Sequence, residues 1–190
     1  MLKTRRRLAV GAVLTAAAAG AYGQTAEATV SFGASIITNK AVGQIEVEGS
    51  GFRLGGRFNF NQGRFLGHEI GVGYNRTSLA VGPDKSGMSM IQVFYDFLLH
   101  ALPEGSAVRP FVCGGGGFSS FYPPGTSVST GGFTKFGYNY GAGVKFKVSE
   151  KYGMRLDLRD YVTGKPFGNF ADVRGRLHAI EMSAGFGIVF

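Results

Sequence analysis

Polar and apolar residues alternate one by one over long stretches of this chain. Between positions 180 and 190 every even position is apolar. The odd positions from 181 to 187 carry Glu181, Ser183, Gly185 and Gly187. A period of two is typical of a β-strand whose two faces meet different surroundings. A strand of about ten residues is also long enough, when tilted, to cross the hydrocarbon of a bilayer. The pattern therefore predicts a membrane-spanning strand that closes the chain at Phe190.

The same alternation recurs in eight runs. They cover residues 28–38, 51–60, 67–80, 88–99, 108–121, 133–148, 154–163 and 177–190. Short connections rich in turn residues follow the second, fourth and sixth runs, whereas the connections 39–50, 81–87, 122–132 and 164–176 are longer on average. An even number of strands, with short turns at one end and longer loops at the other, is the layout of a bacterial membrane barrel. We therefore expect an all-β fold, an eight-stranded antiparallel up-and-down transmembrane β-barrel.

The two faces of these runs differ in bulk as well as in polarity. In the sixth run Phe136, Tyr138 and Tyr140 alternate with Gly137 and Asn139. A soluble barrel such as a lipocalin is the alternative, and it would turn its polar face to water. Here much of the polar face is glycine or serine, which suits the crowded lumen of an eight-stranded barrel. The bulky apolar face could not fit inside, so we assign it to the lipid.

This assignment places charged side chains inside the barrel. Buried charges are tolerable only when they are paired and hydrogen-bonded. We therefore predict a salt-bridge network that plugs the lumen at mid-height. Its expected members are Arg53, Arg57, Glu69, Asp96, Lys145, Lys147, Arg155, Asp157, Arg159 and Glu181. Candidates for the aromatic girdles at the membrane interfaces are Tyr74, Tyr138, Tyr140, Tyr152 and Tyr161.

The first 23 residues have the features of a secretory signal peptide. A basic start with Arg5, Arg6 and Arg7 precedes an Ala-rich apolar run, and small residues suitable for cleavage occur up to Gly23 and again up to Ala28. We expect a signal at 1–23 and one barrel domain at 24–190. Removing residues 1–23 would take four of the 20 Lys and Arg and none of the 12 Asp and Glu, so the net charge falls from +8 to +4. The mature chain thus gives no case for a nucleic-acid partner.

Residues capable of chemistry are few. Cys113 is the single cysteine, so no internal disulfide is possible, and the run 114–117 of four glycines lacks the residues of a phosphate-binding loop. His178 and Ser183 lie five apart, so in a strand they point to opposite faces and cannot form a nucleophile–base pair. The three histidines are expected at interfaces or in loops. The sequence predicts no catalytic site, metal site or cofactor.

Three segments carry a family resemblance. The last residues 185–190, the segment Arg109-Pro110-Phe111-Val112 before the glycine run, and the segment 155–161 resemble the small outer-membrane β-barrel proteins of Gram-negative bacteria, the OmpA-transmembrane and OmpX-like group. The resemblance implies residence in outer-membrane lipid, and delivery by periplasmic chaperones and the barrel-assembly machinery. It also implies that Phe186, Ile188 and Phe190 form the assembly signal.

The resemblance names a fold and a destination but no reaction. We expect a structural or surface-interaction role, with the four longer loops contacting an extracellular ligand that the sequence does not identify. A narrow channel for ions or small solutes is the alternative, because a charged lumen could serve it. A lipid-modifying outer-membrane enzyme is the weaker alternative.

Overall fold

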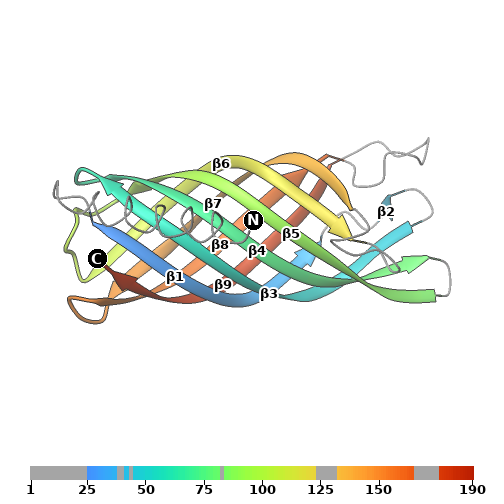
Figure 1. Cartoon of the computed structure of the whole chain (residues 1–190), viewed down its shortest axis with the longest axis horizontal. Coiled ribbons are helices and arrows are strands. Elements are labelled where there is room, and N and C mark those ends of the chain that lie inside the picture. Colours follow the sequence, from blue (N-terminus) through green and yellow to red (C-terminus); the bar gives the residue numbers. More distant parts are fainter. Residues whose placement is uncertain (1–24, 38–40, 43–44, 82–83, 123–131, 165–175) are drawn as a thin grey trace, which may run out of the picture.

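The computed structural model describes residues 25–37, 41–42, 45–81, 84–122, 132–164 and 176–190, and eight long antiparallel strands among them close into a barrel (Figure 1). The long strands are β1 (Ala26–Ile37), β3 (Ile45–Gln62), β4 (Leu66–Val81), β5 (Asp84–His100), β6 (Val108–Tyr122), β7 (Phe133–Lys147), β8 (Tyr152–Thr163) and β9 (Leu177–Val189). The two-residue β2 (Ala41–Val42) pairs with the start of β3. The predicted fold is confirmed. None of the described residues forms a helix with the length and hydropathy that crossing a bilayer would require.

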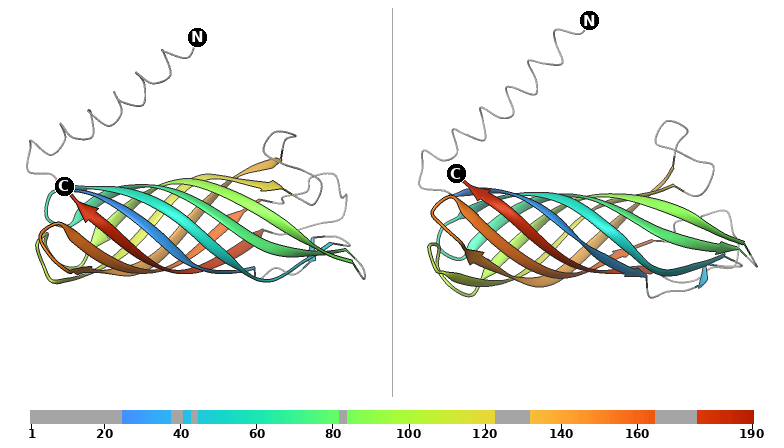
Figure 2. Two further views of the ribbon diagram at one scale, coloured as in Figure 1. Left: turned by 60° about the horizontal axis from the view of Figure 1, so that its bottom comes forward. Right: turned by 90° about the horizontal axis from the view of Figure 1, so that it is seen from below.

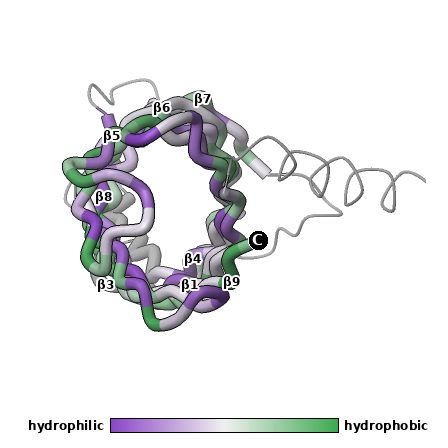
Figure 3. Tube along the Cα trace, turned by 90° about the vertical axis from the view of Figure 1, so that its left-hand side faces the viewer, coloured by the Kyte–Doolittle hydropathy of each residue, from purple (hydrophilic) through white to green (hydrophobic). Residues whose placement is uncertain are grey.

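The barrel closes because β1 pairs with both β3 and β9. Thr29 lies opposite Arg57 on one side and opposite Gly187 on the other. Viewed along its axis, the chain forms a complete ring (Figure 3). Every long strand therefore has two hydrogen-bonded neighbours, and no strand edge is left open to lipid, where unpaired backbone groups would cost several kcal/mol each.

Three tight turns gather at the end of the barrel where the chain terminates (Figure 2). Two of them contain glycines with positive φ, Gly63 at 80° and Gly105 at 88°. Residues with a Cβ rarely adopt this left-handed conformation, which explains glycine at these two positions. In bacterial barrels the short turns lie on the periplasmic side. We call this end the periplasmic end and the opposite one the outer end.

Two of the expected outer loops are largely strand. β3 begins at Ile45, inside the expected loop 39–50, and the ladder between β4 and β5 continues to the pair Val81 and Asp84. Only two residues therefore separate β4 from β5, and the expected loop 81–87 was wrong. Residues 79–87 do not alternate between apolar and polar, so the period of two does not mark the strand ends there. Ile45 to Glu48 do alternate, but this short segment was assigned to the expected loop.

The outward face of the barrel is apolar and the inward face is polar in its central part. The outward side chains of Val30 and Phe136 are 73% and 65% exposed in the isolated chain, whereas inward-pointing Glu69 and Arg155 are 0% and 1% exposed. A soluble protein has the opposite arrangement, with apolar groups inside and charges outside. The outer wall is therefore the lipid-facing wall.

The lumen is not polar throughout. A buried hydrophobic cluster fills its outer end and consists of Ile37, Met88, Met90, Phe94, Phe121, Tyr161, Leu177 and Ala179. A smaller one, Leu98, Phe111 and Cys113, lies toward the periplasmic end. Tyr161 was expected in an aromatic girdle, but it points inward and its ring packs edge-on against Phe94 at 4.9 Å. In these strands both faces are apolar near the barrel ends, so alternation alone does not reveal the inner cluster.

Candidate functional site

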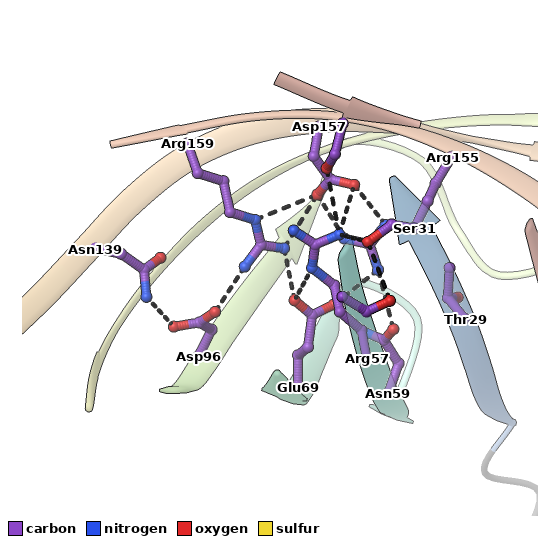
Figure 4. A network of polar contacts seen from close by, with 12 residues as sticks. Thr29, Ser31, Arg57, Asn59, Glu69, Asp96, Asn139, Arg155, Asp157 and Arg159 are labelled. Atoms are coloured by element: carbon purple, nitrogen blue, oxygen red, sulfur yellow. Dashed lines mark hydrogen bonds and ion pairs between the residues drawn. The ribbon is translucent and has the colours of Figure 1, made fainter. Parts of the chain in front are cut away.

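A network of ion pairs occupies the middle of the lumen (Figure 4). Arg159 of β8 contacts three carboxylates. Its Nη1 is 2.7 Å from Oδ2 of Asp96, and its Nη2 is 2.5 Å from Oε1 of Glu69 and 3.1 Å from Oδ1 of Asp157. All four side chains are almost fully buried. Arg159 and Asp157 share one face because they lie two apart in β8, and Glu69 of β4 and Asp96 of β5 lie opposite each other in their ladder.

Arg155 lies two residues before Asp157 on the same inward face. Its Nε and Nη2 donate to the two carboxylate oxygens of Asp157 at 2.8 and 2.7 Å, and its Nη1 donates to Oε2 of Glu69 at 2.7 Å. The guanidinium also stands 5.0 Å from the centre of the Phe111 ring. A bidentate pair of this kind fixes both distance and orientation, which makes it stronger than a single contact.

Two further arginines enter from β3. Arg57 donates from Nη2 to Oε1 of Glu181 at 2.7 Å, and it lies 3.5 Å from both Glu69 and Asp157. Arg53 forms an ion pair with the same Glu181. Glu181 is thus shared between two cations, as Glu69 is among three.

The network is balanced in charge and supplemented by neutral donors. It contains the cations Arg53, Arg57, Arg155 and Arg159 and the anions Glu69, Asp96, Asp157 and Glu181. Asn59 donates to Glu69 at 2.8 Å, Asn139 to Asp96 at 2.6 Å and Ser183 to Glu181 at 2.8 Å. Since a buried charge is tolerable only when it is paired and hydrogen-bonded, the balance and the extra donors together explain how eight charges remain in the lumen.

Two lysines that were assigned to this network lie elsewhere. Lys145 is buried in the lumen near the periplasmic end, where its Nζ pairs with Oε2 of Glu27 at 2.6 Å. A cavity of about 350 Å³ at that mouth is lined by this pair and Arg109. The placement of Lys147 inside was wrong, because its side chain is 37% exposed and pairs with Glu150 in the turn. Lys147 is the last residue of β7, at the periplasmic rim of the barrel, where an inward position meets water.

The comparisons place this geometry in a family. The family model described as outer membrane protein beta-barrel domain matches residues 8–190. The chain belongs to this family. A search of curated protein sequences found no match. The protein is therefore a small outer-membrane β-barrel with a buried salt-bridge network inside.

Solved structures of similar shape come from several outer-membrane barrels. Neisserial surface protein A shares 14% identity with a TM-score of 0.61, covering 88% of this chain and 97% of that one. Ail, the attachment invasion locus protein of Yersinia pestis, shares 12% identity with a TM-score of 0.56, covering 88% and 99%. The outer membrane enzyme PagL shares 18% identity with a TM-score of 0.51, covering 85% and 98%. Identities this low establish the common fold alone.

Two of the three histidines of this outer-membrane barrel, His68 and His100, form hydrogen bonds within the barrel. His68 lies on the outer wall near the periplasmic end, bonded to the Tyr95 hydroxyl at 2.6 Å and to Gln62 at 2.9 Å, and stacked on Phe60 at 4.9 Å. His100 was expected at an interface or in a loop, but it is 2% exposed inside the lumen, with Nδ1 3.2 Å from the carbonyl oxygen of Phe65.

His178 differs from these two because it bonds to a carboxylate on the outer wall. Its Nδ1 is 2.8 Å from Oδ2 of Asp160. The predicted separation from Ser183 holds, since Ser183 donates to Glu181 inside the lumen. The sequence did carry a signal for this pair, because both residues occupy the even, lipid-facing positions of their strands, where charge is unusual. Among the described residues, no three His, Cys, Asp or Glu side chains are arranged to hold a metal ion.

Proposed function

We propose that this outer-membrane barrel is non-conducting and has a structural or surface-interaction role. The ion pairs of Arg155 and Arg159 with Glu69 support the proposal. In the ring order β1-β9-β8-β7-β6-β5-β4-β3, strands β8 and β4 are four steps apart in either direction. They therefore face each other across the whole lumen, and their side chains meet in its middle.

Passage of a hydrated ion would require these contacts to open. Breaking a buried pair so that one charge remains unpaired typically costs about 3–5 kcal/mol. Glu69 alone bonds to two arginines within 2.7 Å, so several such contacts would have to break together. The hydrophobic cluster at the outer end, with Met88 and Phe121 both 0% exposed, would obstruct a permeating ion a second time.

A narrow channel is the second candidate, and one observation favours it. Asn75 Oδ1, Gln92 Nε2 and Ser119 Oγ are buried in the lumen without a hydrogen-bond partner among the described residues. Buried polar atoms of this kind usually bind water. Water bound to these atoms would provide part of a permeation path.

Conductance in planar bilayers separates these two functions. The full mature barrel would be inserted at equal amounts beside a porin as the positive control, and insertion would be checked by the heat-modifiable migration of the recovered protein. We expect no steady single-channel openings from the barrel. Steady, ion-dependent openings at the same level of insertion would refute the plugged lumen and establish the channel.

The surface role is proposed from the outer end of the barrel. Two similar structures are named as an attachment protein and a surface protein, which supports contact with other surfaces over transport. The β4–β5 hairpin continues to Val81 and Asp84, so it extends the outer end of the barrel. Most of the expected loops 122–132 and 164–176 lies outside the described residues. An enzymatic role is not proposed, although PagL shows that an enzyme can have this fold.

We propose that residues 1–23 are a signal peptide that directs export. We also propose that Phe186, Ile188 and Phe190 form the signal that the barrel-assembly machinery recognises. β1 begins at Ala26, and Glu27 pairs with buried Lys145. Cleavage after Gly23 would keep this pair and cleavage after Ala28 would remove it, which supports the earlier site.

A further inference from the structure

A polar cluster interrupts the apolar outer wall near the outer end of β7, β8 and β9. Oδ2 of Asp160 accepts hydrogen bonds from the Tyr140 hydroxyl at 2.9 Å and from Nδ1 of His178 at 2.8 Å. Tyr140 lies opposite Asp160 in the β7–β8 ladder, and His178 lies two residues farther toward the outer end, opposite Val162. All three side chains occupy outward positions, so the cluster faces lipid rather than the lumen.

Arg176 extends the cluster toward the rim. Its Nη1 donates to the Tyr138 hydroxyl at 2.9 Å, and its guanidinium carbon lies 5.6 Å from the centre of that ring. Tyr138 and His178 flank Val162 in the register, so the arginine, which starts on the β9 side, reaches across this position. Val162 is 1% exposed although it points outward. The Tyr138 ring stacks on the Tyr140 ring at 6.4 Å, so Tyr138 connects the arginine to the Tyr140, Asp160 and His178 group.

The position of the cluster suits the headgroup region of the outer leaflet. A charged side chain on the lipid face of a barrel costs about 2–4 kcal/mol at the midplane and close to zero at the interface. Tyrosine and arginine accumulate at this depth because they have an apolar body and a polar tip. Four polar groups between Asp160 and the outer rim thus favour a surface where lipid headgroups, rather than acyl chains, are the neighbours.

Two acceptors in the cluster lack partners. Oδ1 of Asp160 is buried without a hydrogen bond among the described residues. In the neutral tautomer that donates Nδ1–H to Asp160, Nε2 of His178 is also an acceptor, and it has no partner within the described part of the chain. Buried polar atoms are rarely left unsatisfied, so Asp160 Oδ1 requires a donor from outside the protein. The His178 side chain is 35% exposed, so its Nε2 is accessible to the same ligand.

We propose that Asp160, His178 and Arg176 bind the phosphorylated sugar headgroup of an outer-leaflet lipid. Arg176 donates to the phosphate oxygens, a pairing that its planar guanidinium favours. Asp160 Oδ1 and His178 Nε2 accept hydrogen bonds from the sugar hydroxyls, and Tyr140 holds the carboxylate in place. The combination of one cationic donor with two acceptors fits a headgroup that has both phosphate and hydroxyl groups.

Native mass spectrometry of the intact barrel in detergent tests this proposal, with titrations of lipid A and of phosphatidylcholine, which has a phosphate but no headgroup hydroxyl. We expect lipid A to bind at least about tenfold more tightly than phosphatidylcholine. Arg176→Gln and His178→Phe should each weaken lipid A binding about tenfold, the loss expected for one charge-assisted or one well-placed hydrogen bond. Heat-modifiable migration verifies folding, and His178→Phe adds only an apolar group to a lipid-facing wall, so this variant should fold in any case.

Arg76→Gln is the matched control, because Arg76 also points outward near the outer end, on β4, away from the cluster. Lipid A binding by this variant should equal that of the wild type. Equal losses in Arg76→Gln and Arg176→Gln would show general charge attraction and overturn the proposal, as would equal affinity for phosphatidylcholine. Displacement of lipid A by inorganic phosphate at equal concentration would also overturn it, since the site would then bind a free anion.

Discussion

Glu69→Gln is the substitution that tests the lumenal network most directly. Glu69 is fully buried, accepts hydrogen bonds from Asn59, Arg155 and Arg159, and lies within 3.5 Å of Arg57. Glutamine has nearly the same shape, so the substitution removes the negative charge without creating a cavity. It also replaces one carboxylate oxygen by an NH₂ group, so either Arg155, which donates to Oε2, or Arg159, which donates to Oε1, is left facing another donor.

The expected cost follows from the charge balance. The wild-type network has four cations and four anions, so the variant retains four cations against three anions in a buried space. Removing one partner from a buried ion pair costs about 3–5 kcal/mol. At about 1.4 kcal/mol per factor of ten, the folding equilibrium should shift by more than about a hundredfold.

Urea unfolding in detergent micelles or thin lipid vesicles measures this shift. The chain has no tryptophan, so far-UV circular dichroism and the migration of unheated samples on gels are the suitable signals. Glu150→Gln is the matched control, because Glu150 has the same chemistry in an ion pair with Lys147 but its side chain is 89% exposed. An exposed pair of this kind contributes about 0–1 kcal/mol, so the control midpoint should barely move.

A double variant gives a second check on the same reasoning. Glu69→Gln with Arg155→Gln restores equal numbers of cations and anions, so its cost should be smaller than the sum of the two single costs by about 0.5–3 kcal/mol. If Glu69→Gln unfolds at the same urea concentration as Glu150→Gln, the buried pairs do not determine stability and the energetic argument is refuted.

Two further predictions concern the barrel wall and its last residue. In Gly115→Ala the new Cβ would overlap the backbone oxygen of Tyr95 and a carboxylate oxygen of Asp96, so urea unfolding should show clear destabilisation. Gly114→Ala is the control. Its Cβ meets only the Asn139 oxygen at 3.6 Å, so the stability should be nearly unchanged. Deletion of Phe190 should clearly reduce the amount of barrel in outer-membrane fractions. It should hardly lower the unfolding midpoint of the purified protein, because Phe190 adds a single backbone hydrogen bond to Ala26 at 2.8 Å. Normal surface display of the truncated chain would contradict its role as an assembly signal.

The barrel was predictable because two physical requirements act on every residue of a spanning strand. Backbone groups in lipid must all be hydrogen-bonded, which requires a closed sheet. Each side chain must face either the lipid or the lumen, so apolar and polar residues alternate along the strand. The turns with Gly63 and Gly105 completed the prediction, because positive φ has a strong residue preference. A hairpin end beyond the bilayer is free of both requirements, and residues 84–87 do not alternate, so the start of β5 was not predicted.

The charge network was only partly predictable, for a related reason. Parity places Arg53, Arg57 and Arg155 inside, but it does not give their height along the barrel axis or their partners. Lys147 has the parity of a lumenal residue, yet it lies at the rim and pairs with Glu150 in the turn. The pair of Lys145 with Glu27 depends on the register between strands far apart in sequence. Height and register are set by the closure of the ring, which alternation within one strand does not specify.

The network also explains how that register is specified. β8 directs Arg155, Asp157 and Arg159 into the lumen, and a shift of one residue against its neighbours would turn all three outward. The two arginines alone would then cost about 4–8 kcal/mol in mid-membrane lipid, in addition to the ion pairs lost inside. That sum approaches the entire stability of a typical domain, roughly 5–15 kcal/mol. The buried charges therefore stabilise one strand pairing against its nearest competitor, so their effect on register should exceed their net contribution to stability within the correct register.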